Sequence, residues 1–277
     1  MRRATTKHMR GRIGTWALLL ASLLLSPLCQ AVQIVKISAK DPSVLATPDV
    51  KTEMKNGQIV KRRQMSQSAD KSFQSGICSM QIYSDDIASY PVDEFIFALE
   101  GKAKLTSADG TVLEVTAGDA LFIPKGWKGR WDTNGFKEVY VTYSPEKPVE
   151  PANGPTAAAP QPRKISSTDN LALTTADVKT HDIFRYRVLG KSADGNFRAG
   201  FSSMRSKRDM ESGSDVEEVL IMIDGSETFA SPDGSVVKAK PGDVVFMPKG
   251  WKGHYSTEGY QEIYVIYGPE CMAQNNC

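Results

Sequence analysis

The chain has 277 residues, with 34 Lys and Arg against 32 Asp and Glu, and 8% of its residues are aromatic. No stretch interleaves basic and aromatic residues at the density typical of nucleic-acid binding, so that class of partner is disfavoured. The whole chain contains three histidines, which limits the metal sites that it can build.

The first 31 residues have the layout of a secretory signal peptide. MRRATTKHMRGR carries five basic and no acidic residues, and the apolar run WALLLASLLLSPL follows it. Pro27 breaks this run, which is shorter than the roughly 20 residues of a membrane-spanning helix. We expect cleavage after Ala31, a periplasmic or secreted mature chain and no membrane association after cleavage; an uncleaved anchor is the alternative. Removing five of the 34 basic residues leaves 29 against 32 acidic ones, a net charge near −3.

Short runs rich in β-branched and aromatic residues predict β-strands in the mature chain. In chain order they include FIFALEG (95–101), TVLEVTAGD (111–119), ALFIPKG (120–126) and EVYVTY (138–143), with turn signals such as ADG (108–110) between them. Helical periodicity is weak throughout. The sequence therefore predicts an all-β protein built from sandwiches or barrels.

A Pro/Ala-rich stretch divides the mature chain. SPEKPVEPANGPTAAAPQPR contains six prolines from Pro145 to Pro162, a composition typical of a semi-extended spacer. We expect a first unit at 32–146, a linker at 147–162 and a second unit at 163–277 that ends in a short Cys-containing tail. Each unit is long enough for its own core.

Three cysteines remain after cleavage: Cys78, Cys271 and Cys277. In an oxidising compartment the last two could close a small loop in the tail. Cys78 is expected to be a buried small side chain. The pairing stays open at this point, and nothing in the sequence marks a catalytic cysteine.

The two units are copies of one another. From Phe73 onward the chain aligns with itself at an ungapped offset of 124, and GDALFIPKGWKGRW (118–131) matches GDVVFMPKGWKGHY (242–255) at nine of fourteen positions. Before that point the offset is 128, so the first copy is four residues longer somewhere in Glu53–Gln67. Almost the whole mature chain is thus one unit repeated.

Each copy resembles a cupin, so the chain resembles a bicupin with two jelly-roll β-barrels. The second cupin motif is Gly, five residues, Pro, one residue, Gly, two residues and His. Gly118, Pro124 and Gly126 fit this spacing, as do Gly242, Pro248 and Gly250. The first motif ends in Glu, six residues and Gly, which Glu94 with Gly101 and Glu218 with Gly225 match. The P-x-G-x-x-G pattern is similar to that of (S)-ureidoglycine aminohydrolase-like cupin domains.

The metal ligands that this resemblance implies are missing. Gly129 and Gly253 stand where the second motif has its histidine, and Ile87–Tyr90 and Glu211–Ser214 contain none of the first motif's histidines. His181 and His254 are the only histidines outside the signal peptide, too few for one three-histidine site. We therefore expect no metal and no cofactor.

Strand alternation predicts which side chains face the barrel interiors. His254 directly follows Gly253, so it is expected at the surface, although a bulge could change this; His181 is expected in a loop or at an edge. Trp131 and Tyr255, two residues past the replaced histidine, are expected to face inward by this alternation, and Glu94 and Glu218 by the carboxylate position that the resemblance implies. The expected ligand-binding set also includes Tyr140 and Tyr264, which match between the copies and whose facing the sequence leaves open. Glu138 and Glu262 also match between the copies.

Three functions remain open. The preferred hypothesis is an exported, metal-free bicupin that binds a small polar molecule, such as a sugar or a small organic acid. The second is an aminohydrolase- or isomerase-like enzyme that uses Glu94 or Glu218 with a non-standard metal site, so whether a reaction is catalysed stays open. The third is an interaction protein of the cell envelope without a ligand. A homodimer is compatible with all three.

Overall fold

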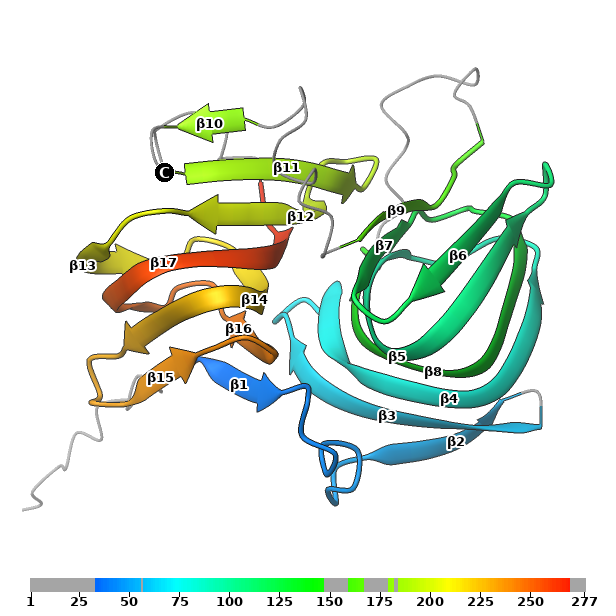
Figure 1. Cartoon of the computed structure of the whole chain (residues 1–277), viewed down its shortest axis with the longest axis horizontal. Helices are drawn as coiled ribbons and strands as arrows, with labels where there is room; N and C mark the ends of the chain where they lie inside the picture. The colour runs from blue at the N-terminus through cyan, green and yellow to red at the C-terminus, as the bar shows by residue number, and fades with distance from the viewer. Residues whose placement is uncertain (1–32, 56, 147–158, 167–178, 182–183, 270–277) are drawn as a thin grey trace, which may run out of the picture. The chain divides into compact units, whose positions relative to one another are not determined.

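The computed structural model describes residues 33–55, 57–146, 159–166, 179–181 and 184–269. Every regular element in these ranges is a β-strand, and the strands form two antiparallel sheets (Figure 1). The all-β prediction is therefore confirmed. No helix in this part of the chain is long and apolar enough to cross a bilayer. The predicted signal peptide, most of the linker and the predicted Cys271–Cys277 loop lie outside the described ranges.

The sheet of the first repeat has eight strands in the order β2-β3-β4-β8-β5-β7-β9, and β6 pairs with β5. Three strands of 15 residues each bend around the barrel interior (Figure 1). The strands are β2 (Lys51–Lys55), β3 (Gln58–Gln67), β4 (Phe73–Ile87), β5 (Asp93–Ser107), β6 (Val112–Thr116), β7 (Asp119–Ile123), β8 (Gly129–Tyr143) and β9 (Arg163–Ser166).

The sheet of the second repeat has nine strands in the order β1-β16-β14-β17-β12-β11-β10, with β13 paired to β17 and β15 to β14. The strands are β1 (Val35–Ser38), β10 (Lys179–His181), β11 (Phe184–Lys191), β12 (Phe197–Met204), β13 (Arg208–Gly213), β14 (Glu217–Ala230), β15 (Val236–Ala239), β16 (Asp243–Met247) and β17 (Lys252–Tyr267).

The two repeats exchange their first strands. β1 precedes the first barrel in the chain but pairs with β16 of the second, with Ser38 opposite Asp243. β9 precedes the second barrel but pairs with β7 of the first, with Ser166 opposite Asp119. The division at the linker, which followed composition, therefore does not separate the two sheets: each sheet contains one strand from the other side of the linker.

β7 and β16 are buried on both faces, which explains why ALFI and VVFM are continuous apolar runs rather than alternating ones. In β7, Leu121 and Ile123 face the interior of the first barrel, whereas Ala120 and Phe122 join a core shared by both repeats. The equivalent residues of β16 divide in the same way between the second barrel and the shared core. The repeats are thus joined by a common apolar layer.

Two reciprocal hydrogen bonds cross between the repeats. The Tyr143 hydroxyl donates to Asp194 Oδ2 at 2.6 Å, and the hydroxyl of Tyr267, its repeat equivalent, donates to Asp70. The Tyr143 ring also stacks on Phe197, with 5.6 Å between ring centroids. Equivalent residues make equivalent contacts, so the repeats are related by an approximate two-fold arrangement.

The repeated PKGWKG segment is a turn that leads into the long last strand of each barrel. Gly126 and Gly250 have φ of 85° and 86°, a conformation that favours glycine. The side chain of Trp127 is buried, and its Nε1 donates to Ser107 Oγ at 2.9 Å; Trp251 makes the equivalent bond to Ser231 at 3.0 Å. In both copies the tryptophan therefore packs against its own turn.

The glycine that ends this segment is required by close packing. A Cβ at Gly129 would lie 2.4 Å from the carbonyl oxygen of Thr106 and 2.5 Å from the Trp127 ring. A Cβ at Gly253 would lie 2.3 Å from the carbonyl oxygen of Ala230 and 2.7 Å from the Trp251 ring. The indole therefore occupies the space into which a side chain at this position would project.

Candidate functional site

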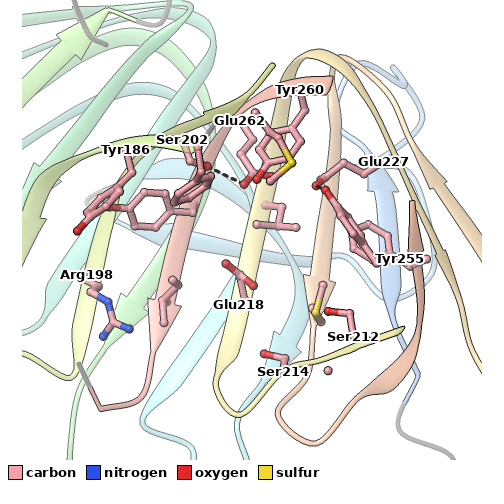
Figure 2. A pocket seen from close by; sticks show the side chains of 18 of the residues that line it. Tyr186, Arg198, Ser202, Ser212, Ser214, Glu218, Glu227, Tyr255, Tyr260 and Glu262 are labelled. Atoms are coloured by element: carbon pink, nitrogen blue, oxygen red, sulfur yellow. Dashed lines mark hydrogen bonds between the residues drawn. The ribbon is translucent and has the colours of Figure 1, made fainter. Parts of the chain in front are cut away.

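Each barrel contains an interior cavity. The cavity of the first repeat has a volume of about 720 Å³, and that of the second has a volume of about 280 Å³. Both suit a small molecule rather than a polymer. Figure 2 shows the second cavity, into which the carboxyl groups of Glu218, Glu227 and Glu262 all project.

Five of the six predicted site residues line these cavities. Glu94 and Trp131 line the first, and Glu218, Tyr255 and Tyr264 line the second. Glu138 and Glu262, which match between the copies, also line the two cavities.

Tyr140 is a correction to the predicted set. It is buried as expected, but the guanidinium of Arg62 lies 4.9 Å from its ring centroid, and a Cβ at Gly76 would meet its hydroxyl at 2.6 Å. It therefore packs beside Gly76 and Arg62 and is not among the residues that line the first cavity.

In the first cavity, the carboxyl group of Glu94 is surrounded by partners. The Tyr90 hydroxyl donates to Glu94 Oε2, and the charges of Arg62 and Lys55 stabilise its ionised form. Burial nevertheless raises the pKa of Glu94 above its ordinary value. Burial and the neighbouring Glu94 charge raise the pKa of Glu138 well above its ordinary value, and its Oε2 atom has no hydrogen-bond partner in the described structure.

The second cavity has a third glutamate, Glu227. Glu227 accepts a hydrogen bond of 2.7 Å from the Tyr255 hydroxyl, and Glu262 accepts one of 2.7 Å from the Ser202 hydroxyl. Burial and the charges of Glu227 and Glu218 raise the pKa of Glu262 well above its ordinary value. A protonated Glu262 can donate to Glu227, so these two buried groups share one proton more readily than they ionise together.

Glu218 lies in the same cavity without a hydrogen-bonding partner among the described residues. Burial first, and then the charge of Glu227, raise the pKa of Glu218 to about 7, against an opposing effect of Arg198. Ser214 takes the repeat position that Tyr90 has in the first barrel. Glu218 therefore lacks the tyrosine that covers Glu94 and is exposed to the cavity.

The residues at the family's metal positions do not fit a cupin metal site. The indole of Trp127 or Trp251 fills the space beside the glycine that replaces the second motif's histidine, and Tyr90 lies in the stretch where the first motif has its histidines. In the described part of the chain no group of three His, Cys, Asp or Glu side chains is placed to hold a metal ion.

His254 is not among the residues that line the second cavity. His254 is partly exposed on β17, where Nδ1 lies 3.1 Å from Glu211 Oε1 and Nε2 contacts Asp209. These two carboxylates raise its pKa. His181 lies in β10, the edge strand of its sheet. Both placements agree with the sequence analysis.

Several residues that shape the cavities were not predicted. Arg62 and Tyr186 lie in the region where the copies change offset, and Glu227, Tyr90 and Arg198 have no identical residue in the other copy. Repeat identity highlights what the barrels share, so it could not mark the side chains by which they differ. The available signal was a difference between aligned positions of the two copies: Glu227 aligns with Ala103, and Arg198 aligns with Gln74.

We predict that the carboxyl group of Glu138 makes the protein less stable at higher pH. A folded-state pKa above 4.5 means that the native protein keeps a proton that the unfolded chain releases. The free energy of unfolding therefore falls as pH rises above about 4.5, by up to ~1.4 kcal/mol per pH unit for one group. Glu138→Gln should flatten this dependence, as measured by melting temperature between pH 5 and 8.

Glu114→Gln, which changes an exposed glutamate in the same barrel, is the control for this measurement and should retain the parent slope. Parallel slopes for the parent and Glu138→Gln would show that Glu138 ionises at its ordinary pKa in the folded protein, and would contradict the prediction.

Two β-barrels that carry one interior cavity each and are built from a repeated unit are consistent with a bicupin architecture. Residues 68–139, in the first repeat, match the family model of the EutQ-like cupin domain. None of the curated proteins matches the chain at a significant level.

Solved structures with the same fold cover most of the chain. A protein of unknown function from Pseudomonas syringae pv. tomato has a TM-score of 0.60 at 15% identity, over 84% of this chain and 99% of its own. A putative glyoxylate-induced protein from Pseudomonas aeruginosa has a TM-score of 0.58 at 12% identity, over 94% and 96%. HEPD from Streptomyces albus, solved with 2-hydroxyethylphosphonate and Fe(II), has a TM-score of 0.55 at 11% identity, over 87% and 77%. At these identities the likeness shows the fold alone.

Proposed function

We propose that this chain is an exported, metal-free bicupin that binds a small polar molecule in its barrels. The observation that carries this proposal is a set of buried carboxyl oxygens that no N–H or hydroxyl group of the described residues satisfies: Glu138 Oε2 in the first cavity, and Glu227 Oε2 and Glu262 Oε2 in the second. The proton that Glu227 and Glu262 share can satisfy part of this set. An unpaired buried polar atom costs about 1–3 kcal/mol. A ligand that carries hydrogen-bond donors, such as a sugar, would remove that cost.

Of the two ligand classes expected from the sequence, a sugar and a small organic acid, the carboxyl groups favour the sugar. A small organic acid would bring a further negative charge beside three carboxyl groups in the second cavity, which is unfavourable at low dielectric constant. A sugar brings hydroxyl donors without charge, and the aromatic side chains around the cavity offer flat apolar faces.

The test is a thermal-shift screen of the full mature chain against small sugars, polyols, organic acids and amines, followed by calorimetry on each compound that stabilises the protein. We expect a stabilisation of several degrees near saturation, because binding to the folded state alone adds about 2.7 kcal/mol at 100 times Kd. Glu262→Gln should weaken binding without lowering the melting temperature. If no compound in the panel stabilises the chain, the proposal is wrong.

A second candidate is an enzyme of aminohydrolase or isomerase type. Glu218, with a pKa of about 7, would be the general base, and the protonated Glu262 in the same cavity would be the acid. The resemblance to (S)-ureidoglycine aminohydrolase-like domains is a reason to test this class, although none of the comparisons supports it. Turnover that survives Glu218→Gln and Glu94→Gln would remove the candidate.

A further inference from the structure

We propose that the cavity of the second repeat takes a small organic cation, a protonated amine, as its ligand. This inference rests on the proposed function, because it names the class of molecule that the same cavity binds. It comes from a comparison of the two barrels, which share their main cavity residues but differ in where their positive charge lies.

In the first barrel, the positive charge comes from the protein's own Arg62, which lies beside Tyr140. Arg62 pairs with Cys78 across β3 and β4, and its guanidinium lies 4.9 Å from the ring centroid of Tyr140. The same guanidinium stabilises the ionised form of Glu94. The Tyr140 ring and, over a longer distance, the charge of Glu94 both stabilise this cation.

The second barrel keeps the ring and the carboxylate but has no cation at the position of Arg62. Its cation, Arg198, acts on Glu218 and Tyr264 from β12 instead. Across β11 and β12, Tyr186 pairs with Ser202, the repeat equivalent of Cys78, so Tyr186 stands where the first barrel has Arg62. Tyr264 and Glu218 take the places of Tyr140 and Glu94, and both line the cavity. A ligand ammonium group would supply the charge that Arg62 supplies in the other barrel.

The second cavity has three glutamates, whereas the first has two, and the other acidic residues that line the first, Asp85 and Asp86, are more exposed. Glu227 occupies the position of Ala103 and adds a third carboxyl group, whose Oε2 atom lacks a partner in the described structure. Arg198 is the single cationic side chain among the residues that line this cavity. Its guanidinium donates to the carbonyl oxygens of Gly268 at 3.0 Å and Pro269 at 3.3 Å, so it is held by the backbone rather than paired with a carboxylate.

The walls of the cavity suit an alkylammonium ion. The rings of Phe184 and Tyr186 stack with centroids 5.8 Å apart, and those of Phe229 and Tyr255 lie 5.5 Å apart. Aromatic faces attract cations and also cover the alkyl part of such a ligand. The volume of about 280 Å³ limits the ligand to a small molecule. A ligand of a few heavy atoms would share the cavity with ordered water.

The experiment compares three probes of equal length: propylammonium, 1-propanol and propionate. Each is titrated into the full mature chain at pH 7.5 and followed by ligand-observed NMR and by calorimetry. We expect propylammonium to bind at least ten-fold more tightly than the other two. Glu218→Gln should weaken it ten-fold or more. Tyr186→Arg, which copies the arrangement of the first barrel, should abolish binding while the melting temperature stays within a few degrees of the parent.

Tyr186→Phe is the matched control, because it keeps the ring without adding charge, and it should bind propylammonium within about three-fold of the parent. The cation inference is overturned if 1-propanol or propionate binds as tightly as propylammonium, or if Tyr186→Arg binds propylammonium like the parent. It is also overturned if only compounds of the sugar and polyol panel bind, in which case the proposed function stands. If neither panel gives binding, both proposals fail.

Discussion

Replacing Gly253 with histidine, the residue that cupin metal sites have at this position, is expected to destabilise the protein rather than to create a metal site. The added Cβ would lie 2.3 Å from the carbonyl oxygen of Ala230 and 2.7 Å from the Trp251 ring. Overpacking of this kind costs about 3 kcal/mol or more, because backbone and a buried indole must both move. We expect the melting temperature to fall by roughly 6–12 °C.

Lys252→His places the same residue type one position earlier, on an exposed side chain of the same turn, and should change stability by less than about 0.5 kcal/mol. Gly129→His should behave like Gly253→His in the first barrel. The interpretation would fail if Gly253→His melted within 2 °C of the parent and bound one equivalent of a divalent metal by elemental analysis. That outcome would mean that the Trp251 ring can move away from residue 253 and leave room for a metal-binding histidine.

The second large effect is expected when the exchanged strand β1 is removed. A chain that lacks residues 32–39 loses the four pairs between β1 and β16 and the buried side chains of Ile37 and Ala39. Burial of one isoleucine contributes about 2–3 kcal/mol, and each lost backbone hydrogen bond about 1 kcal/mol. We expect the free energy of unfolding to fall by roughly 4–6 kcal/mol.

Hydrogen exchange should locate the effect of this truncation. Amides of β16 in the second repeat should lose protection, although the deleted residues lie at the other end of the chain. Val35→Ala changes an exposed residue of the same strand and should leave both the melting temperature and the exchange pattern close to those of the parent. Unchanged protection of β16 in the truncated chain would contradict the strand exchange.

The sequence predicts the barrels well because their determinants are local. Alternation along EVYVTY predicts that Glu138 faces away from Val139 and Val141 but leaves open which side is the cavity. In the structure Glu138 lines the cavity, and the two valines lie in the shared core. The position of Trp131, two residues past Gly129, follows from the same rule. Each of these expectations depends only on neighbouring residues within one strand.

The strand exchange and the unequal cavities could not be predicted in this way. The pairing of β1 with β16 joins segments at opposite ends of the mature chain, and no local pattern in VKIS selects that partner. Tyr140 shares the side of Glu138 by alternation, but Arg62 from another strand packs on its ring. Whether a side chain faces the interior thus depends on the alternation within its own strand. Whether it reaches the cavity also depends on the side chains of neighbouring strands, which can cover it.

The exchange of first strands has a consequence for how the protein is made. Ser38 is synthesised early, yet its partner Asp243 follows 205 residues later, which at roughly 5–20 residues per second takes about 10–40 s. Throughout that time β1 has no sheet to join. The first barrel in turn keeps an open edge at β7 until Arg163–Ser166 has been made. The nascent chain therefore exposes unpaired strand edges until its final strands emerge, and we expect its yield to depend on whatever shields those edges in the meantime.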